Sequence, residues 1–211
     1  MSLTMKSVFI LLAYLAGSIP MGVILSHYFT GKDIRKTGSG NIGATNVYRT
    51  HGRKLGIITL IADALKGALP TLIAMLMGLS AVFVCSVGVA CFLGHLYPVF
   101  LQFKGGKGVA TALGIFAVIS PVALLLSMLI FVLLVYKFRY VSLASLSAAA
   151  SMPLLIGLLN SPEDKAYIIL ALIISALVFY KHKENIIRKR ALLVMLLMFI
   201  ELNPAVLVVT D

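Results

Sequence analysis

Two segments of the chain combine glycines with hydrogen-bond donors and basic side chains in a spacing suited to binding an anion. The first, residues 38–49, reads GSGNIGATNVYR and ends on Arg49. Glycines let successive backbone N–H groups turn toward one point, Ser, Thr and Asn add donors, and an arginine can hold two phosphate oxygens. The segment, called here the first glycine loop, is therefore predicted to bind phosphate. A flexible polar loop whose arginine anchors to lipid headgroups is the alternative.

The second segment, residues 103–108, reads FKGGKG and directly precedes a short apolar run. If that run is a helix, its N-terminus carries partial positive charge and unpaired N–H groups, which suit a phosphate. We call it the second glycine loop. It lacks the GxxxxGK[ST] spacing of nucleotide-binding loops, so ATP hydrolysis is not implied. A tight turn with interfacial lysines is the alternative.

A third set of polar residues lies near the end of the chain. His182 and Asn185 stand three residues apart after the last clear apolar run, a spacing that directs both side chains to one place. Together they could bind a hydroxyl or carbonyl oxygen. Ser142 opens an earlier apolar run and carries a further hydroxyl. A histidine among lysines can equally be a solvated interfacial residue.

Asp63 and Lys66 share a helix face within an apolar run. Ionisable groups at membrane depth are costly unless paired or hydrated, and they often mark a functional cavity. An ion pair that only braces the helix fits equally well, so no catalytic role is assigned to either residue. His95 is interpreted as a packing and hydrogen-bonding residue.

Neither a metal nor a cofactor site is predicted. The histidines at positions 27, 51, 95 and 182 are scattered, and no cluster of carboxylates accompanies them. Cys85 and Cys91 lie in an apolar run, where cysteines behave as small buried hydrophobes.

Composition places these residues in a membrane protein. The 211 residues are 61% hydrophobic and 12% charged, with a mean hydropathy of +1.06. Soluble domains are roughly 45–50% apolar and about 25% charged, so a soluble enzyme is excluded. The net charge of +11 suggests anionic lipid or an anionic substrate as partner, and the scarcity of polar residues leaves no room for a nucleic-acid module.

The apolar runs predict an all-α integral membrane protein with seven transmembrane helices, one of them short. A helix needs about 20 residues to cross the hydrocarbon core, and helices satisfy their own backbone groups in lipid. The predicted spans are residues 7–29, 55–78, 80–102, 108–119, 121–136, 141–159 and 166–180.

The basic residues predict the orientation. With seven crossings, fifteen Lys and Arg residues fall in loops on one side, Lys6 and Lys165 fall on the other, and Lys66 lies within a span. Because cytoplasmic loops carry the excess of Lys and Arg, we expect the N-terminus outside and the loops with the candidate site residues in the cytoplasm. Residues 1–190 are predicted to form one polytopic domain. Residues 191–211 are an apolar tail that is either an eighth span, an interfacial segment or a remnant foreign to the domain.

Seven motifs, taken in order, resemble those of bacterial acyl-phosphate-dependent glycerol-3-phosphate acyltransferases, the PlsY family. They lie at residues 17–22, 38–49, 63–67, 94–100, 103–111, 139–145 and 181–185. The likeness covers residues 14 to about 190, and the tail from Ala191 departs from the family pattern. It implies a seven-helix enzyme of the bacterial inner membrane that faces the cytoplasm. The enzyme would move a fatty acyl group from acyl phosphate to the 1-hydroxyl of glycerol 3-phosphate, giving lysophosphatidic acid and phosphate in the first step of phospholipid synthesis.

The resemblance also implies roles for individual residues. The catalytic candidates are Ser39, Arg49, His182 and Asn185. The candidates for binding substrate or phosphate are Gly40, Asn41, Thr45, Asn46, Lys104, Gly105, Gly106, Lys107, Gly108 and Ser142. Asp63, Lys66 and His95 are taken as structural or uncertain. No carboxylate is poised as general base, so the donor's own phosphate is the favoured proton acceptor and His182 the second choice.

A membrane transporter or flippase for a phosphate-bearing metabolite or lipid is the competing interpretation, because helix ends aimed at an anion also occur at transport sites. The chain shows no internal repeat to support it. A non-catalytic scaffold that binds anionic lipid would not need glycine-rich loops before helices.

Overall fold

A computed structural model of the protein describes residues 1–159 and 165–187. These residues form helices and connecting loops and include no strand. The α-helices are α1 (Leu3–Ser18), α2 (Met21–Thr30), α3 (Ala44–His51), α4 (Arg53–Leu76), α5 (Ala81–Leu96), α6 (Val109–Ile119), α7 (Pro121–Phe138), α8 (Val141–Leu159) and α9 (Lys165–Lys181). Two short 3-10 turns, Ile34–Lys36 and Val99–Leu101, lie in the loops before α3 and α6. The predicted tail at residues 191–211 lies outside the described residues.

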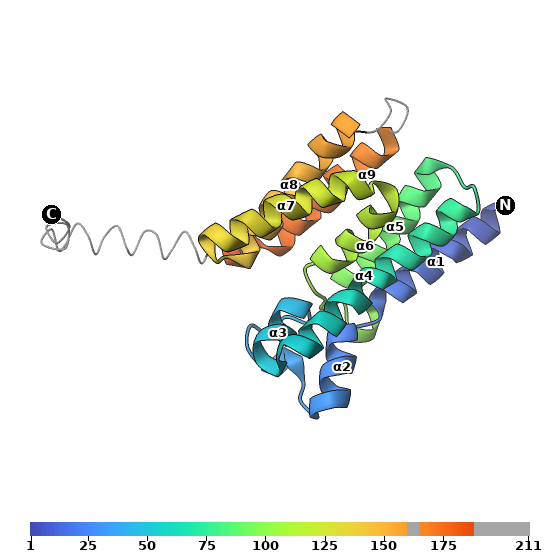
Figure 1. The fold of residues 1–211 in the computed structure, drawn as a ribbon. Coiled ribbons are helices and arrows are strands. Elements are labelled where there is room, and N and C mark those ends of the chain that lie inside the picture. Colours follow the sequence, from blue (N-terminus) through green and yellow to red (C-terminus); the bar gives the residue numbers. More distant parts are fainter. Residues whose placement is uncertain (160–164, 188–211) are drawn as a thin grey trace, which may run out of the picture.

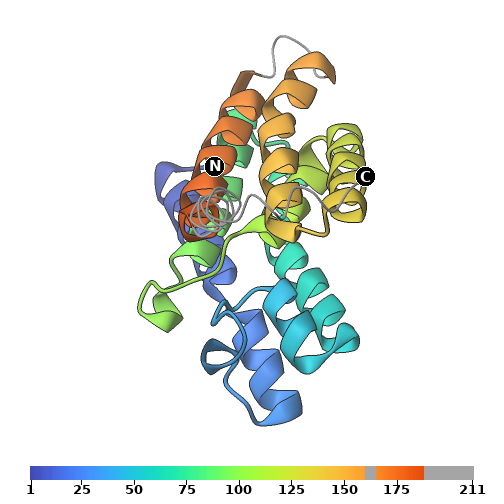
Figure 2. The same ribbon diagram turned by 90° about the vertical axis from the view of Figure 1, so that its left-hand side faces the viewer.

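The helices pack in two connected groups. Helix α5 contacts α1, α4, α6 and α9, while α4 also packs along α6. Helix α8 lies between α7 and α9, as the turned view of Figure 2 shows. Helices α2 and α3 lie at the end of the molecule opposite the N-terminus (Figure 1).

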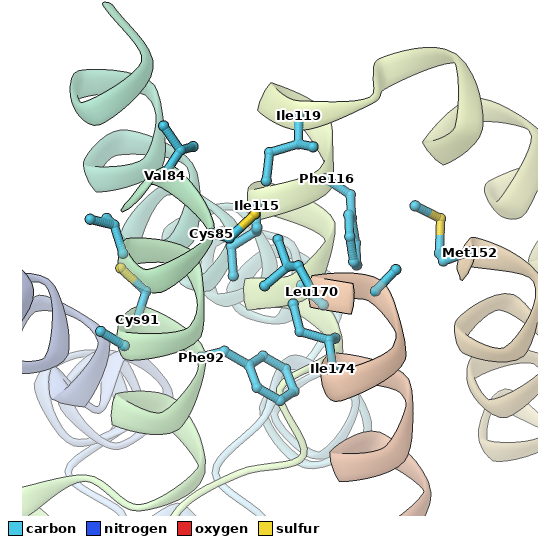
Figure 3. Packing of buried hydrophobic residues seen from close by; sticks show 14 of the residues in the cluster. Val84, Cys85, Cys91, Phe92, Ile115, Phe116, Ile119, Met152, Leu170 and Ile174 are labelled. Carbon is cyan, nitrogen blue, oxygen red and sulfur yellow. The ribbon is translucent and has the colours of Figure 1, made fainter. Parts of the chain in front are cut away.

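The core forms where α5, α6 and α9 meet. Phe92 of α5, Ile115 of α6 and Leu170 of α9 are almost fully buried and face one another (Figure 3). Cys85 and Cys91 are free and buried on α5, as the sequence predicted. Helix α7 instead exposes large apolar side chains, among them Leu125, Leu129 and Leu133. Such a surface is compatible with lipid and not with water.

Within residues 1–159 and 165–187, five helical segments are long and apolar enough to cross a membrane, counting α1 and α2 as one segment. Helix α6 has 11 residues and α9 has 17, both shorter than those five. The predicted short helix thus exists and begins directly after Gly108. These segments agree with the predicted multi-pass helical membrane protein, while seven crossings and their direction stay predictions.

The first predicted span is wrong in one respect. Residues 7–29 do not form one helix, because the chain is extended at Ile19 and restarts at Met21 after Pro20. Proline lacks a backbone N–H and clashes with a preceding helical turn. The break separates α2 from α1, and α2 leads into the first glycine loop.

Candidate active site

The first glycine loop is organised around the side chain of Asn46, which is 4% exposed. Its amide nitrogen donates to the carbonyl oxygens of Ile34, Thr37 and Asn41 at 3.3, 3.0 and 2.9 Å. Its amide oxygen accepts from the N–H of Ser39 at 2.9 Å. The prediction placed Asn46 among the substrate-binding residues, whereas these hydrogen bonds shape the loop itself.

Two glycines of this loop have positive φ angles, +58° at Gly38 and +71° at Gly40. L-residues adopt this conformation rarely, and a Cβ at Gly38 would also overlap the Asn46 side chain. The tight backbone leaves Ser39, Gly40, Thr45 and Arg49 exposed. Asn41 accepts a hydrogen bond from the N–H of Gly43 at 2.8 Å, which fixes the turn that starts α3.

A small apolar cluster joins the two glycine loops. Ile42 and Val47 of the first glycine loop are buried in one cluster with Ile34 and Leu55. Leu101 packs against this cluster. Leu101 stands three residues before Lys104 in the chain. The cluster therefore places the start of the second glycine loop beside the first loop.

The second glycine loop lies directly on the C-terminal end of α5. A Cβ at Gly105 would overlap the carbonyl oxygen of His95, and one at Gly106 would overlap its imidazole Nε2. The N–H of Gly106 donates to the His95 carbonyl at 3.1 Å. The backbone N–H of Gly106 is thus already paired within the protein, and a role for Gly106 in phosphate binding stays a prediction. These two glycines permit a close approach of the loop to α5.

Gly108 has a different reason to be glycine. Its φ is +80°, and a Cβ would overlap the ring of Phe92. Gly108 is the N-cap residue of α6, so the first turn of α6 follows the loop as predicted. Lys104 is exposed, whereas Lys107 is partly buried.

Lys107 connects the second glycine loop to the end of α9. Its Nζ donates a hydrogen bond to Oδ1 of Asn185, 78 residues further along the chain. Lys181, on the last turn of α9, donates from Nζ to the Leu96 carbonyl at 3.1 Å and lies 4.5 Å from the ring centre of Tyr97. Sequence reasoning missed Lys181, whose only signal is its place in the same short motif as His182.

His182 is 3% exposed, and its Nδ1 lies 2.8 Å from the carbonyl oxygen of Val178. A neutral imidazole in this contact carries its proton on Nδ1 and leaves Nε2 as an acceptor. Burial lowers the pKa of His182, the hydrogen bond to Val178 raises it, and the nearby charge of Lys107 lowers it, with a net lowering. His182 is therefore neutral at pH 7 and can accept a hydrogen bond from a hydroxyl.

The pH dependence of activity tests this state of His182. The ratio of kcat/KM between the wild type and His182→Ala should be constant at and above pH 7 and should shrink as the pH falls below about 6.5, the ordinary pKa of histidine, toward the lowered pKa of His182. Protonation removes the acceptor at Nε2, so the wild type loses its advantage as the pH falls. Titrations of substrate affect both enzymes and cancel in the ratio. A ratio that stays constant down to the lowest pH at which both enzymes remain folded would show that the protonation state of His182 has no role.

A groove lies between α8 and α9, and Asn185 is one of its lining residues. Its volume is about 430 Å³, and its lining is almost entirely apolar. Ser142 and Asn185 provide polar groups, while Leu143, Leu146 and Phe179 are among the apolar side chains. Because Asn185 also contacts Lys107, the groove reaches the second glycine loop.

Asp63 and Lys66 form the predicted ion pair. Lys66 Nζ lies 2.9 Å from Asp63 Oδ1, and both side chains are buried on α4. His95 Nδ1 lies 3.7 Å from the same carboxylate oxygen. The structure therefore adds His95 to the pair, a contact between α4 and α5 that the sequence did not predict.

The fold and the site define a class of protein: a multi-pass helical membrane protein with basic, glycine-rich loops beside an apolar groove. The family model described as Glycerol-3-phosphate acyltransferase matches residues 7–192. The chain belongs to this family.

Its relatives are similar over nearly their whole length. Glycerol-3-phosphate acyltransferase of Geotalea daltonii is 56% identical over 190 residues, covering 90% of this chain and 96% of the relative. That of Syntrophotalea carbinolica is 53% identical over 182 residues, covering 86% and 92%. A crystal structure of PlsY (YgiH), an integral membrane glycerol 3-phosphate acyltransferase, in its glycerol 3-phosphate form matches with a TM-score of 0.82 and 42% identity, covering 88% of this chain and 92% of that one. These likenesses favour an acyltransferase over a transporter.

Proposed function

We propose that this glycerol-3-phosphate acyltransferase uses acyl phosphate as its donor and forms lysophosphatidic acid and inorganic phosphate. The observation that carries the proposal is the position of the apolar groove, whose polar residue Asn185 also contacts Lys107. An apolar channel suits a fatty chain, and a lysine in a glycine-rich loop suits a phosphate group beside the reacting end of that chain. A second crystal structure of PlsY is described as its lysophosphatidic acid form, which supports the same product here.

The reaction requires little covalent chemistry from the protein. The 1-hydroxyl oxygen of glycerol 3-phosphate attacks the acyl carbonyl carbon, the bond from that carbon to the phosphate oxygen breaks, and the hydroxyl proton passes to the departing phosphate. Holding the hydroxyl near the carbonyl and stabilising the developing oxyanion are then the main tasks. His182 Nε2 is suited to orient the hydroxyl, because the hydrogen bond to Val178 sets its tautomer.

Each part of the site takes one task. Lys107 and the second glycine loop bind phosphate, while Arg49, Ser142, His182 and Asn185 orient glycerol 3-phosphate. Ser39 and Asn41 lie nearer to acyl phosphate. Asn46 acts indirectly, since its hydrogen bonds hold the backbone that presents Ser39.

We also infer the topology from the charge pattern. Residues 1–190 form one membrane domain with seven crossings, and the site faces the cytoplasm of a bacterium, where the basic loops belong. The site then meets a water-soluble phosphate on one side and a lipid-embedded chain on the other.

Release of phosphate by the purified protein in detergent tests the function. We expect inorganic phosphate to appear from palmitoyl phosphate only when glycerol 3-phosphate is added, together with lysophosphatidic acid in equal amount. A transporter requires a sealed bilayer and releases no phosphate in detergent. Turnover with palmitoyl thioesters but not with palmitoyl phosphate would show that the proposed donor is wrong.

Narrowing the groove tests its role as the acyl channel. Leu146→Trp places a larger side chain in the groove, so we expect kcat/KM to fall about tenfold more for palmitoyl phosphate than for octanoyl phosphate. Leu154→Trp is the matched control, because Leu154 lies on the same helix, is 70% exposed and does not line the groove. Equal losses for both donors in Leu146→Trp would place the acyl chain elsewhere.

A further inference from the structure

The carbonyl groups of the last two residues of α5 and of its C-cap residue, Tyr97, are each bound by a different part of the molecule. A helix leaves its final carbonyl oxygens without partners of its own, so partners must come from elsewhere. The His95 carbonyl accepts from the N–H of Gly106 at 3.1 Å, and the Leu96 carbonyl accepts from Lys181 of α9 at 3.1 Å. The Tyr97 carbonyl accepts from the hydroxyl of Tyr14 of α1 at 2.7 Å. These hydrogen bonds hold the C-terminal end of α5 in place against the second glycine loop.

The imidazole of His95 lies between this loop and the ion pair of α4. On one side, Nδ1 is 3.7 Å from Asp63 Oδ1. On the other, Nε2 occupies the space that a Cβ at Gly106 would need. With a side chain only 3% exposed, the ring has little freedom to move away from either neighbour.

Lys66 extends the contact toward the other glycine loop. Its Nζ pairs with Asp63 Oδ1 at 2.9 Å and donates to the Ile19 carbonyl at 2.9 Å. Ile19 lies at the break between α1 and α2, and α2 leads into the first glycine loop. A continuous set of polar contacts thus runs from this break, through Lys66, Asp63 and His95, to Gly106.

We propose that Asp63, Lys66 and His95 are positioning residues. They set the distance between the second glycine loop and the C-terminal end of α5, and so place the loop for phosphate binding. The inference rests on the proposed function and adds a task to residues that otherwise form a buried ion pair. The carboxylate of Asp63 lies 3.7 Å from one side of the imidazole and limits its movement, and the other side of the imidazole lies against the backbone at Gly106. That backbone in turn sets where the next residue, Lys107, meets Asn185 and the phosphate.

A double-mutant cycle between His95 and Gly106 separates positioning from general stability. Gly106→Ala alone should raise the KM for glycerol 3-phosphate or for acyl phosphate about tenfold, because its Cβ displaces the loop from the imidazole. His95→Asn retains a polar atom near Asp63 but is too short to reach Gly106. In the His95→Asn background, adding Gly106→Ala should therefore change the same KM by no more than about twofold.

Three companion variants support this measurement. His95→Asn alone should raise the KM several-fold, while His95→Gln, which keeps the length of the side chain, should restore most of the affinity. Ser127→Ala is the control for loss of a buried hydrogen bond, because Ser127 donates to the Ala148 carbonyl at 3.0 Å between α7 and α8. We expect it to lower the melting temperature without changing either KM.

The cycle also has a form that does not depend on turnover. The same variants can be compared by how much inorganic phosphate raises their melting temperature. A wild type that releases no phosphate from palmitoyl phosphate would refute the proposed donor, yet coupling between His95 and Gly106 in phosphate binding would still support the positioning role. A Gly106→Ala effect of equal size in both backgrounds, in KM and in phosphate binding, would overturn the inference.

Discussion

Lys107→Ala is expected to lower kcat/KM by about 100-fold, because it removes the charge-assisted hydrogen bond to phosphate that we propose for this lysine. The ammonium group has three donors, so it can contact Asn185 and a phosphate oxygen together. Steady-state kinetics with each substrate varied in turn will show which KM rises. The substrate whose KM rises identifies the phosphate that the second glycine loop holds.

Substitutions of two other lysines serve as comparisons for Lys107→Ala. Lys104→Ala should have a smaller effect than Lys107→Ala, because Lys104 is exposed at the start of the same loop. Lys183→Ala removes an exposed lysine that lies 4.9 Å from the ring centre of Tyr180 and has no part in the proposed site, so it controls for the loss of charge alone. If Lys107→Ala leaves both KM values and kcat at wild-type levels, the second glycine loop is not a phosphate site.

Asn46→Asp is expected to lower kcat/KM by about 100-fold although it changes one atom, because a buried carbonyl left without its partner costs about 1–3 kcal/mol. The carboxylate retains an acceptor for the N–H of Ser39 but cannot donate to Ile34, Thr37 and Asn41. It instead brings negative charge against three carbonyl oxygens. The backbone that presents Ser39 should then lose its shape.

The matched control is Thr50→Val, which keeps the shape of the side chain and removes a hydroxyl that donates to the Asn46 carbonyl at 2.8 Å. We expect Thr50→Val to retain most of the activity. Melting temperatures of both variants in detergent separate local damage from global unfolding. Wild-type kcat/KM in Asn46→Asp would show that this network does not hold the site.

For Asn46, the residue type predicts the hydrogen-bonding chemistry but not the hydrogen-bond partners. Its place among glycines and hydroxyls predicted a donor for substrate, and its chemistry was correctly identified as that of a donor. The groups to which the Asn46 amide donates were not predicted, because the partners of an amide depend on which backbone groups the folded loop places around it. Asn46 meets the carbonyl of Ile34, 12 residues away, only once the loop has closed.

For the glycines of the second loop as well, the local pattern predicts the structure only in part. Their spacing and the helix that follows were predicted from local pattern, and α6 begins at the expected place. The reason for Gly106 was not local, because it is the imidazole of His95 on another helix. Likewise, Pro20, Pro70 and Pro153 all lie within predicted apolar runs. The helix breaks at Pro20, whereas Pro70 and Pro153 lie inside continuous helices. Hydropathy alone does not tell these cases apart.

The sequence by itself determined the membrane setting, the helical class and the segments that carry glycines and basic residues. These are local properties, since lipid compels each span to satisfy its backbone hydrogen bonds within itself and to keep apolar side chains outward. Only the tertiary structure decided that Lys107 meets Asn185, that the imidazole of His95 lies against Gly106 and that a groove opens between α8 and α9. Such contacts join residues on different helices, and they follow from how the helix surfaces pack together, which no local pattern records.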